Sequence, residues 1–254
     1  MFTVAKYTFL EVFRNHFLWT IFAINIIFIL ILLLFNSLSL NETNRIFYDI
    51  SLGYVELSHI GILLFLGNNL LSREIEQRTL YLLFVRPIPR YKILLGKFFG
   101  FAGILSFSFF VQLLFIICSF LVFKVDFLGT FIISLATIFV TIQTLLAVLL
   151  FLSIVIPQSL VIFATIAVYI VGNTTYSLLD YALQNNNIIL EYISKFFLVI
   201  FPNFGGVNIK NIVDTPIQIN FQSLGFSLTG IFIYLIVIGI LGSFIFSKKN
   251  FDNV

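Results

Sequence analysis

The sequence predicts an all-α polytopic membrane protein with six transmembrane helices. Sixty per cent of the 254 residues are apolar and only 10% are charged, whereas a soluble domain carries about 25% charged residues. The mean hydropathy is +1.11, and the apolar residues form runs long enough to cross a bilayer as helices of about 20 residues. This composition excludes a soluble globular domain and favours a single transmembrane domain over residues 1–254.

The predicted elements follow one another with short connections until the last third of the chain. Apolar residues spaced along one face of residues 1–16 predict a short helix in the membrane interface. Because the apolar run that begins at residue 127 is too long for one helix, we expect Pro157-Gln158 to divide it. The predicted spans are 17–40, 50–71, 91–123, 127–152, 158–179 and 221–246. Residues 180–220 form an outer loop, whose apolar centre at 196–204 predicts partial insertion into the outer leaflet.

The distribution of lysine and arginine predicts that both termini are cytoplasmic, because cytoplasmic loops carry an excess of these residues. The predicted inner segments hold most of them: Lys6, Arg14, six residues within 72–100, Lys248 and Lys249. The predicted outer segments hold Arg45, Lys124, Lys195 and Lys210. The net charge of +3 follows this topology and forms no continuous basic surface, so we expect no nucleic-acid partner.

Residues 72–100 form the only long charged segment of the chain, and they lie between the second and third predicted spans. Glu74 and Arg78 stand four residues apart with the acid first, the favourable order for a pair on a helix surface. Pro87 and Pro89 then end the helix, because each proline removes a backbone donor and restricts the residue before it. We expect a short, stiff element along the inner membrane surface.

This segment resembles the signature of ABC-2-type transporter permeases. The resemblance rests on Arg73-Glu74-x-Glu76-Gln77-x-Thr79-Leu80-x-Leu82-Leu83, on Arg86-Pro87-Ile88-x-Arg90 and on Leu94-Leu95-Gly96-Lys97. Arg78 stands where the family usually has glycine. The resemblance implies that residues 72–90 are a coupling helix moved by a separate ATPase. It assigns ATPase coupling to Arg73, Glu74, Glu76, Gln77, Arg78, Thr79, Arg86, Pro87 and Arg90.

The same resemblance implies the partners and the location of the chain. Two copies of a cytoplasmic ABC ATPase would pair with a homodimer or heterodimer of permease subunits in the lipid bilayer. The membrane would be the cytoplasmic (inner) membrane of a bacterium, and the substrate would leave outward. The family also places a re-entrant element between spans five and six, where residues 180–220 lie.

The chain lacks a motif for hydrolysing ATP itself. A phosphate-binding loop around Gly96-Lys97 would need glycine at 91 and serine or threonine at 98, where the chain has Tyr91 and Phe98. No catalytic residues, metal site or cofactor are therefore expected in this chain. ATP and Mg would be bound by the partner ATPase.

Polar residues in the second predicted span are the other candidates for function. Glu56 and His59 share a helix face, and Asn68 and Asn69 lie near its cytoplasmic end. An ionisable group inside a membrane suggests function, although a position near the outer interface favours a structural role for Glu56. In the third span, Gly96, Gly100 and Gly103 predict close packing of helices.

Two other functions stay open at this point. Glu56 and His59 could serve an integral membrane enzyme acting on a lipid, or the chain could be a non-transporting membrane scaffold. The lone cysteine, Cys118, lies in an apolar run and predicts packing. No residue pattern identifies the substrate.

Overall fold

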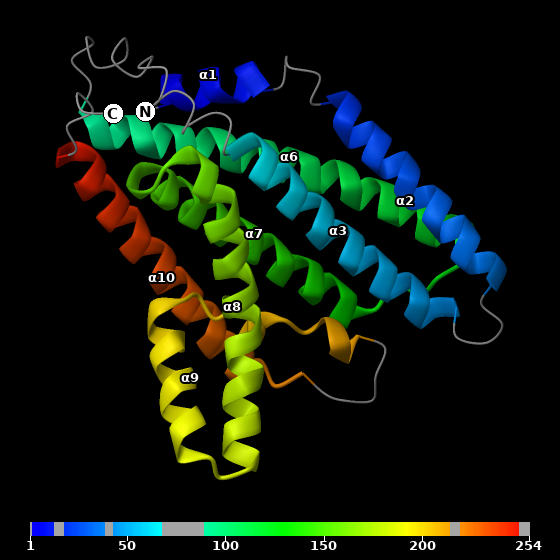
Figure 1. Cartoon of the computed structure of the whole chain (residues 1–254). Helices are drawn as coiled ribbons and strands as arrows, with labels where there is room; N and C mark the ends of the chain where they lie inside the picture. Colours follow the sequence, from blue (N-terminus) through cyan, green and yellow to red (C-terminus); the bar gives the residue numbers. More distant parts are fainter. Residues whose placement is uncertain (1, 13–17, 39–42, 68–88, 214–218, 249–254) are drawn as a thin grey trace.

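The computed structural model describes residues 2–12, 18–38, 43–67, 89–213 and 219–248, and within these ranges it contains helices and no strands (Figure 1). The elements in chain order are α1 Phe2–Val12, α2 Leu18–Leu38, α3 Thr43–Gly67, α6 Arg90–Phe123, α7 Gly129–Val155, α8 Gln158–Gln184, α9 Ile188–Ile200, the 3₁₀ turns η3 Gly205–Val207 and η4 Lys210–Ile212, and α10 Phe221–Lys248. The predicted all-α class is confirmed for this part of the chain.

Four of the described helices are long and apolar enough to cross a membrane: α6, α7, α8 and α10. A fifth span results if α9 and the segment Gly205–Ile212, which meet at 88°, form one broken or re-entrant crossing. Helix α2 contributes a shorter apolar stretch, Ala23–Leu34, and α3 carries Arg45, Asp49 and Glu56. The chain is therefore a multi-pass helical protein by length and composition, and the count of six spans stays a prediction.

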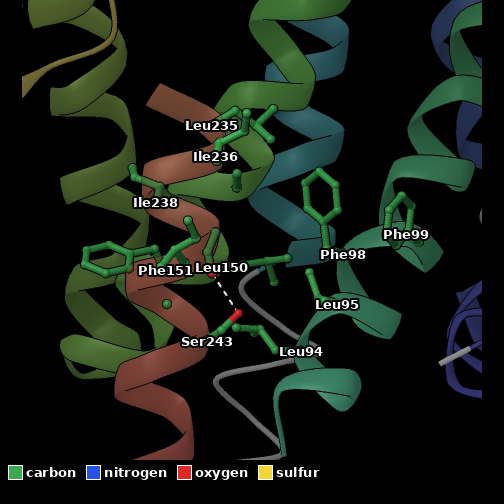
Figure 2. A pocket seen from close by; sticks show the side chains of 14 residues that line it. Leu94, Leu95, Phe98, Phe99, Leu150, Phe151, Leu235, Ile236, Ile238 and Ser243 are labelled. Carbon is green, nitrogen blue, oxygen red and sulfur yellow. Dashed lines mark hydrogen bonds between the residues drawn. The ribbon is translucent and has the colours of Figure 1, made fainter. Parts of the chain in front are cut away.

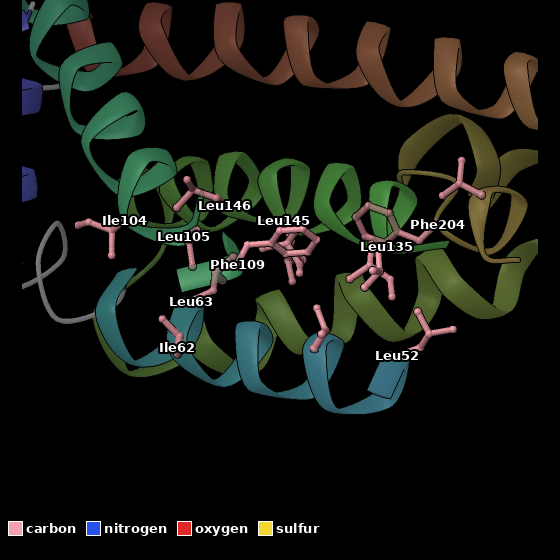
Figure 3. Close-up of a cluster of buried hydrophobic side chains, with 14 of the residues drawn as sticks. Leu52, Ile62, Leu63, Ile104, Leu105, Phe109, Leu135, Leu145, Leu146 and Phe204 are labelled. Carbon is pink, nitrogen blue, oxygen red and sulfur yellow. The ribbon is translucent and has the colours of Figure 1, made fainter. Parts of the chain in front are cut away.

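Helix α7 forms the centre of the bundle. It packs against α3, α6, α8 and α10, and it is the most buried of the four long apolar helices. Figure 3 shows one continuous apolar core in which Leu135 and Leu145 of α7 meet Leu63 of α3, Phe109 of α6 and Phe204 from the segment before α10. Dispersion contacts of this kind hold membrane helices together, because lipid tails are as apolar as the side chains.

Interhelical hydrogen bonds join neighbouring helices inside this core. The Tyr54 hydroxyl of α3 donates to Asn25 Oδ1 of α2 over 2.8 Å, and the Ser58 hydroxyl donates to Gln112 Oε1 of α6 over 3.1 Å. At the far end of α3, the Tyr48 hydroxyl donates to the Asp126 carbonyl over 2.6 Å. Polar side chains at such positions fix which helices are neighbours, since each would otherwise lose its partner in an apolar medium.

The helix ends follow local backbone chemistry. Pro89 and Pro157 adopt extended conformations directly before α6 and α8, as expected for a residue that fixes φ near −65°. Lys124 lies in the left-handed region at φ 55° and ends α6. Helix α8 continues past the predicted limit at residue 179 to Gln184, because the chain has no helix breaker before the asparagines at 185–187.

Helix α9 packs against the end of α8, so the predicted outer loop begins as a helical hairpin (Figure 1). Asn186 turns the chain with φ 51°, a conformation that asparagine tolerates better than most residues. The Asn187 side chain then caps α9 by accepting a hydrogen bond from the Leu190 amide. Helix α9 is thus a capped apolar helix that follows the polar turn at residues 185–187.

The N-terminal helix α1 lies along the beginning of α6 (Figure 1). Gly100 permits this close approach: a Cβ atom there would lie 2.7 Å from Thr8 Cβ and 2.9 Å from the Ala5 carbonyl oxygen. A Cβ atom at Gly103 would lie 3.4 Å from the Phe9 ring, and Gly96 is buried one turn earlier on α6. The first element of the chain is thus packed onto the protein and not only onto lipid.

This contact gives a stability prediction for Gly100. We expect Gly100→Ala to lower the midpoint of thermal unfolding in detergent, because an added methyl group must displace backbone and side-chain atoms of α1, at a cost of about 1–3 kcal/mol. Gly61→Ala in α3 is the matched control, since a Cβ atom there meets nothing within 4 Å. Circular dichroism melting curves in which both variants unfold together would contradict the close α1–α6 packing.

Candidate functional site

Most residues of the predicted coupling segment lie outside the described part of the chain: Arg73, Glu74, Glu76, Gln77, Arg78, Thr79, Arg86 and Pro87. Asn68 and Asn69 at the end of the second predicted span also lie outside it. Arg90 is described and begins α6. Its Nη1 donates to the carbonyl oxygen of Ser247 near the end of α10 over 3.4 Å. Gly67 at the end of α3 and Arg90 at the start of α6 are therefore the described helix ends nearest to the coupling segment.

The described residues contain a buried acidic side chain, Glu56 on α3. Glu56 is only 7% exposed, and both of its carboxylate oxygens are engaged. The Tyr169 hydroxyl of α8 donates to Oε1 over 2.5 Å, and Lys210 Nζ of η4 forms an ion pair with Oε2. Glu56 thereby joins three elements that are far apart in the chain.

Two asparagines extend this polar group, which we name the outer cluster after the predicted outer loop that supplies Asn208 and Lys210: Glu56, Tyr169, Asn173, Asn208 and Lys210. Asn173 donates to the Tyr169 carbonyl over 3.1 Å, and Asn208 Nδ2 lies 3.5 Å from Asn173 Oδ1. The space among them is about 10 Å³, room for one water-sized sphere. The outer cluster is a filled polar contact and not a substrate cavity.

Close backbone packing places the cluster. The turn before η3 rests on α8, because a Cβ atom at Gly172 would lie 2.6 Å from the Pro202 carbonyl oxygen and 2.8 Å from the Phe204 ring. On the other side of the contact, a Cβ atom at Gly205 would lie 2.5 Å from the Asn173 carbonyl oxygen. Phe204 is 1% exposed and enters the core. This docking carries the following residues, Asn208 and Lys210, toward α3 and α8.

The ion pair at Glu56 is a neutralising contact. An isolated carboxylate in an apolar interior carries a large desolvation cost, which a paired cation and a hydrogen-bond donor offset. Glu56 has both, and the Lys210 side chain keeps 25% of its surface exposed. With its oxygens bound, the carboxylate is suited to holding the segment 201–213 against α3 and not to acting as a base.

The structure does not bring Glu56 and His59 into one site. His59 faces α6: its Nδ1 lies 2.8 Å from the Val55 carbonyl oxygen, and its ring packs against Phe109 at 5.5 Å between centroids. Glu56 faces α8 and η4 instead. Within the described ranges no three metal-binding side chains come together. The pair therefore has no geometry that supports chemistry on a lipid.

The sequence identified Glu56 but not its partners. Lys210 lies 154 residues away from Glu56 and Tyr169 lies 113 residues away, so periodicity along α3 carries no information about them. The only local signal is that Lys210 is a cation among the apolar residues Val207, Ile209, Ile212 and Val213 of the predicted outer loop. A cation in such a setting needs a carboxylate partner, and α3 supplies one.

Comparison with known families accounts for most of the chain. The sequence profile described as ABC-2 family transporter protein matches residues 57–251, a range that begins one residue after Glu56 and ends beyond α10. The chain belongs to the ABC-2 transporter family. The predicted family is thus confirmed, and the match includes the segment between α3 and α6 on which the prediction rested. A comparison with curated proteins gives no match.

Membership of the ABC-2 family identifies the chain as a membrane subunit for transport and not a catalytic one. The four to five apolar helices agree with a multi-pass membrane protein. Proteins of this family typically work with an ABC ATPase. The outer cluster is then a contact inside a permease domain, and its Glu56 lies in the middle of α3.

The ion pair at Glu56 predicts a strong stability effect. We expect Glu56→Gln to lower the free energy of unfolding by about 1–3 kcal/mol, somewhat less than the loss for a fully buried pair, because Lys210 remains partly solvated. The double variant Glu56→Gln/Lys210→Gln should recover part of the loss, since no unpaired charge remains. Thermal unfolding in detergent measures both.

Glu191→Gln is the matched control for this test. Glu191 pairs with Lys195 over 2.5 Å, but the two side chains are 28% and 57% exposed on one face of α9, and such pairs contribute less than about 0.5 kcal/mol. An equal effect of Glu56→Gln and Glu191→Gln, or a double variant as unstable as the sum of its single variants, would refute the structural role of the buried pair.

Proposed function

We propose that this chain is the permease subunit of an ATP-driven ABC exporter, which moves a substrate across a bacterial cytoplasmic membrane with a separate ATPase subunit. The observation that carries the proposal is the family match over residues 57–251. Residues 72–90 within it have the charged and proline-rich pattern of a coupling helix. The absence of a phosphate-binding loop at Tyr91 and Phe98 is in keeping with a partner that hydrolyses ATP with Mg.

In this proposal the coupling segment acts on α3 and α6 together, because it joins the end of one to the start of the other. Glu56 lies eleven residues before the end of α3 at Gly67, or about 16 Å at 1.5 Å per residue. Helices transmit displacement along their axes because their hydrogen-bonded backbones resist compression. A push on the coupling segment therefore reaches Glu56 and the outer segment 201–213 that Glu56 holds.

We propose further that the outer cluster closes the outward end of the pathway. Opening this end requires that segment 201–213 move relative to α3 and α8, and the ion pair and the Gly172 contact are the interactions that such a movement must break. The partial exposure of the Lys210 side chain supports this role. When the ion pair separates, water can solvate the Lys210 ammonium, which it could not do if the pair were fully buried. Outward release of substrate would coincide with separation of Glu56 from Lys210.

The proposed assembly contains two permease copies, identical or related, and two ATPases, with α2 and α3 as the first two of six spans. Helix α1, the start of α6 and the end of α10 lie at one end of the bundle (Figure 1). That arrangement supports a topology in which both termini share the cytoplasmic side with the coupling segment. A non-transporting scaffold would need no ATPase. Co-purification of an ATPase, described below, therefore separates the transporter hypothesis from the scaffold hypothesis.

The proposed topology predicts the labelling of single cysteines in intact cells. In a Cys118→Ser background, we expect a membrane-impermeant thiol reagent to modify cysteine introduced at Asn186 and at Asn208 but not at Arg78. The reason is the excess of lysine and arginine on the predicted inner side. Labelling at 78 together with protection at 186 would reverse the orientation and contradict export through the proposed coupling.

The proposed coupling predicts different defects for two carboxylates. Glu74→Lys should abolish co-purification of the ATPase, because reversing a charge at a partly desolvated interface replaces attraction with repulsion. Membrane insertion should survive, since the inner side becomes more positive. Glu56→Gln should leave the ATPase bound, because Glu56 lies in the outer cluster.

The purified chain alone is the reference for this experiment. We expect it to hydrolyse no ATP, whereas the complex with its ATPase does. ATP hydrolysis by the homogeneous chain would overturn the assignment of hydrolysis to a partner. Normal ATPase binding by Glu74→Lys, with loss of activity in Glu56→Gln, would instead return weight to the enzyme hypothesis.

A further inference from the structure

An apolar groove opens between the beginning of α6, the end of α7 and the second half of α10 (Figure 2). Its volume is about 420 Å³. Leu94 and Phe98 of α6, Phe151 of α7 and Ile236 of α10 are among the side chains that form its walls. The only polar side-chain atom in the lining is the Ser243 hydroxyl, which donates to the Gly239 carbonyl over 2.7 Å. The groove therefore suits an alkyl chain and offers no free hydrogen-bonding group to a polar ligand.

Two glycines of α10 shape the groove. A Cβ atom at Gly239 would meet nothing within 4 Å, whereas one at Gly242 would lie 3.6 Å from both Leu94 and Phe151. Gly242 thus marks where α10 meets the other two helices, and Gly239 marks the open space. A side chain introduced at position 239 would occupy this space without a clash.

Basic groups stand at one end of the groove. Arg90 precedes Leu94 by one turn of α6 and donates to the Ser247 carbonyl of α10. On α10, Phe244 follows the groove residue Ile240 by one turn, and Lys248 Nζ lies 4.2 Å from the centre of the Phe244 ring. The helices α6, α7 and α10 contain no aspartate or glutamate at all. Charge complementarity at this end favours an anion.

We propose that this groove is a binding site for one anionic phospholipid, with an acyl chain in the groove and the phosphate at the Arg90 and Lys248 end. At about 30 Å³ for a group the size of a water molecule, the volume accommodates roughly a dozen methylene groups. Basic residues that flank a space between transmembrane helices are the usual feature of a lipid-headgroup site. The site requires that the chain lie in a membrane and is independent of ATP, substrate and transport direction.

Native mass spectrometry of the full chain in detergent tests the proposal. Dioleoyl phosphatidylglycerol and dioleoyl phosphatidylcholine are added at equal concentrations. We expect the chain to retain one phosphatidylglycerol about fivefold or more in preference to phosphatidylcholine, because the basic residues at the end of the groove attract the anionic headgroup. Gly239→Leu should remove this retained lipid, because leucine fills the groove. Lys248→Gln should reduce the preference for phosphatidylglycerol over phosphatidylcholine.

Gly230→Leu is the matched control. It lies on the same helix, a Cβ atom there also meets nothing within 4 Å, and it is not part of the groove. Its retained lipid should equal that of the unchanged chain. Equal binding of the two lipids by the unchanged chain, or equal lipid retention by Gly239→Leu and Gly230→Leu, would overturn the proposal.

A second measurement needs no variant and holds even if Gly239→Leu fails to fold. Phosphatidylglycerol with a photoactivatable diazirine in its acyl chain should attach to peptides from residues 93–99 and 235–243 of the unchanged chain. Competition by unlabelled phosphatidylglycerol should remove these adducts. Adducts spread evenly over the exposed faces of α6, α8 and α10, or none in the groove because a second copy of the chain covers it, would contradict a lipid site.

Discussion

The ion pair between Glu56 and Lys210 is the contact on which the position of segment 201–213 in this permease depends. Glu56 is 7% exposed on α3, and without partners its charge would destabilise the packing of α3 against α7. Lys210 supplies the opposite charge from a segment that has only two short 3₁₀ turns of its own. The ion pair and the buried Phe204 side chain hold this segment in place. Lys210 of the segment in turn neutralises the charge of Glu56, which would be costly to bury on α3 without a partner.

This interdependence gives α3 two roles. One end of the helix leads into the segment that resembles a coupling helix, and its middle carries the carboxylate that fixes the outer segment. The interhelical hydrogen bonds from Tyr54 and Ser58 also lie on α3. A displacement of α3 therefore disturbs contacts to α2, α6, α8 and η4 at once. Such an element is a suitable carrier of movement between the two sides of a membrane.

The sequence predicted the fold class and the family, because hydropathy and the pattern at residues 73–90 are local properties. It also located the break at Pro157, where backbone chemistry acts on adjacent residues. Helix α8 extends five residues beyond the predicted span 158–179 to Gln184, since polar residues at 180 do not stop a helix that packs on α9. The outer cluster was beyond prediction. Its members are brought together by the close contact of Gly172 with residues 202–204. A single sequence does not show which glycine will pack against a turn that is distant along the chain.

The most direct test of the central claim is to lock the outer cluster and measure ATP turnover by the assembled complex. Cysteines at 173 and 208, where the two asparagine side chains lie 3.5 Å apart, would be joined by a short reducible thiol crosslinker in a Cys118→Ser background. If separation of the outer segment from α8 is part of the cycle, crosslinking stops ATP turnover while the ATPase stays bound, and a reductant restores turnover. Unchanged turnover by the fully crosslinked complex would contradict the account.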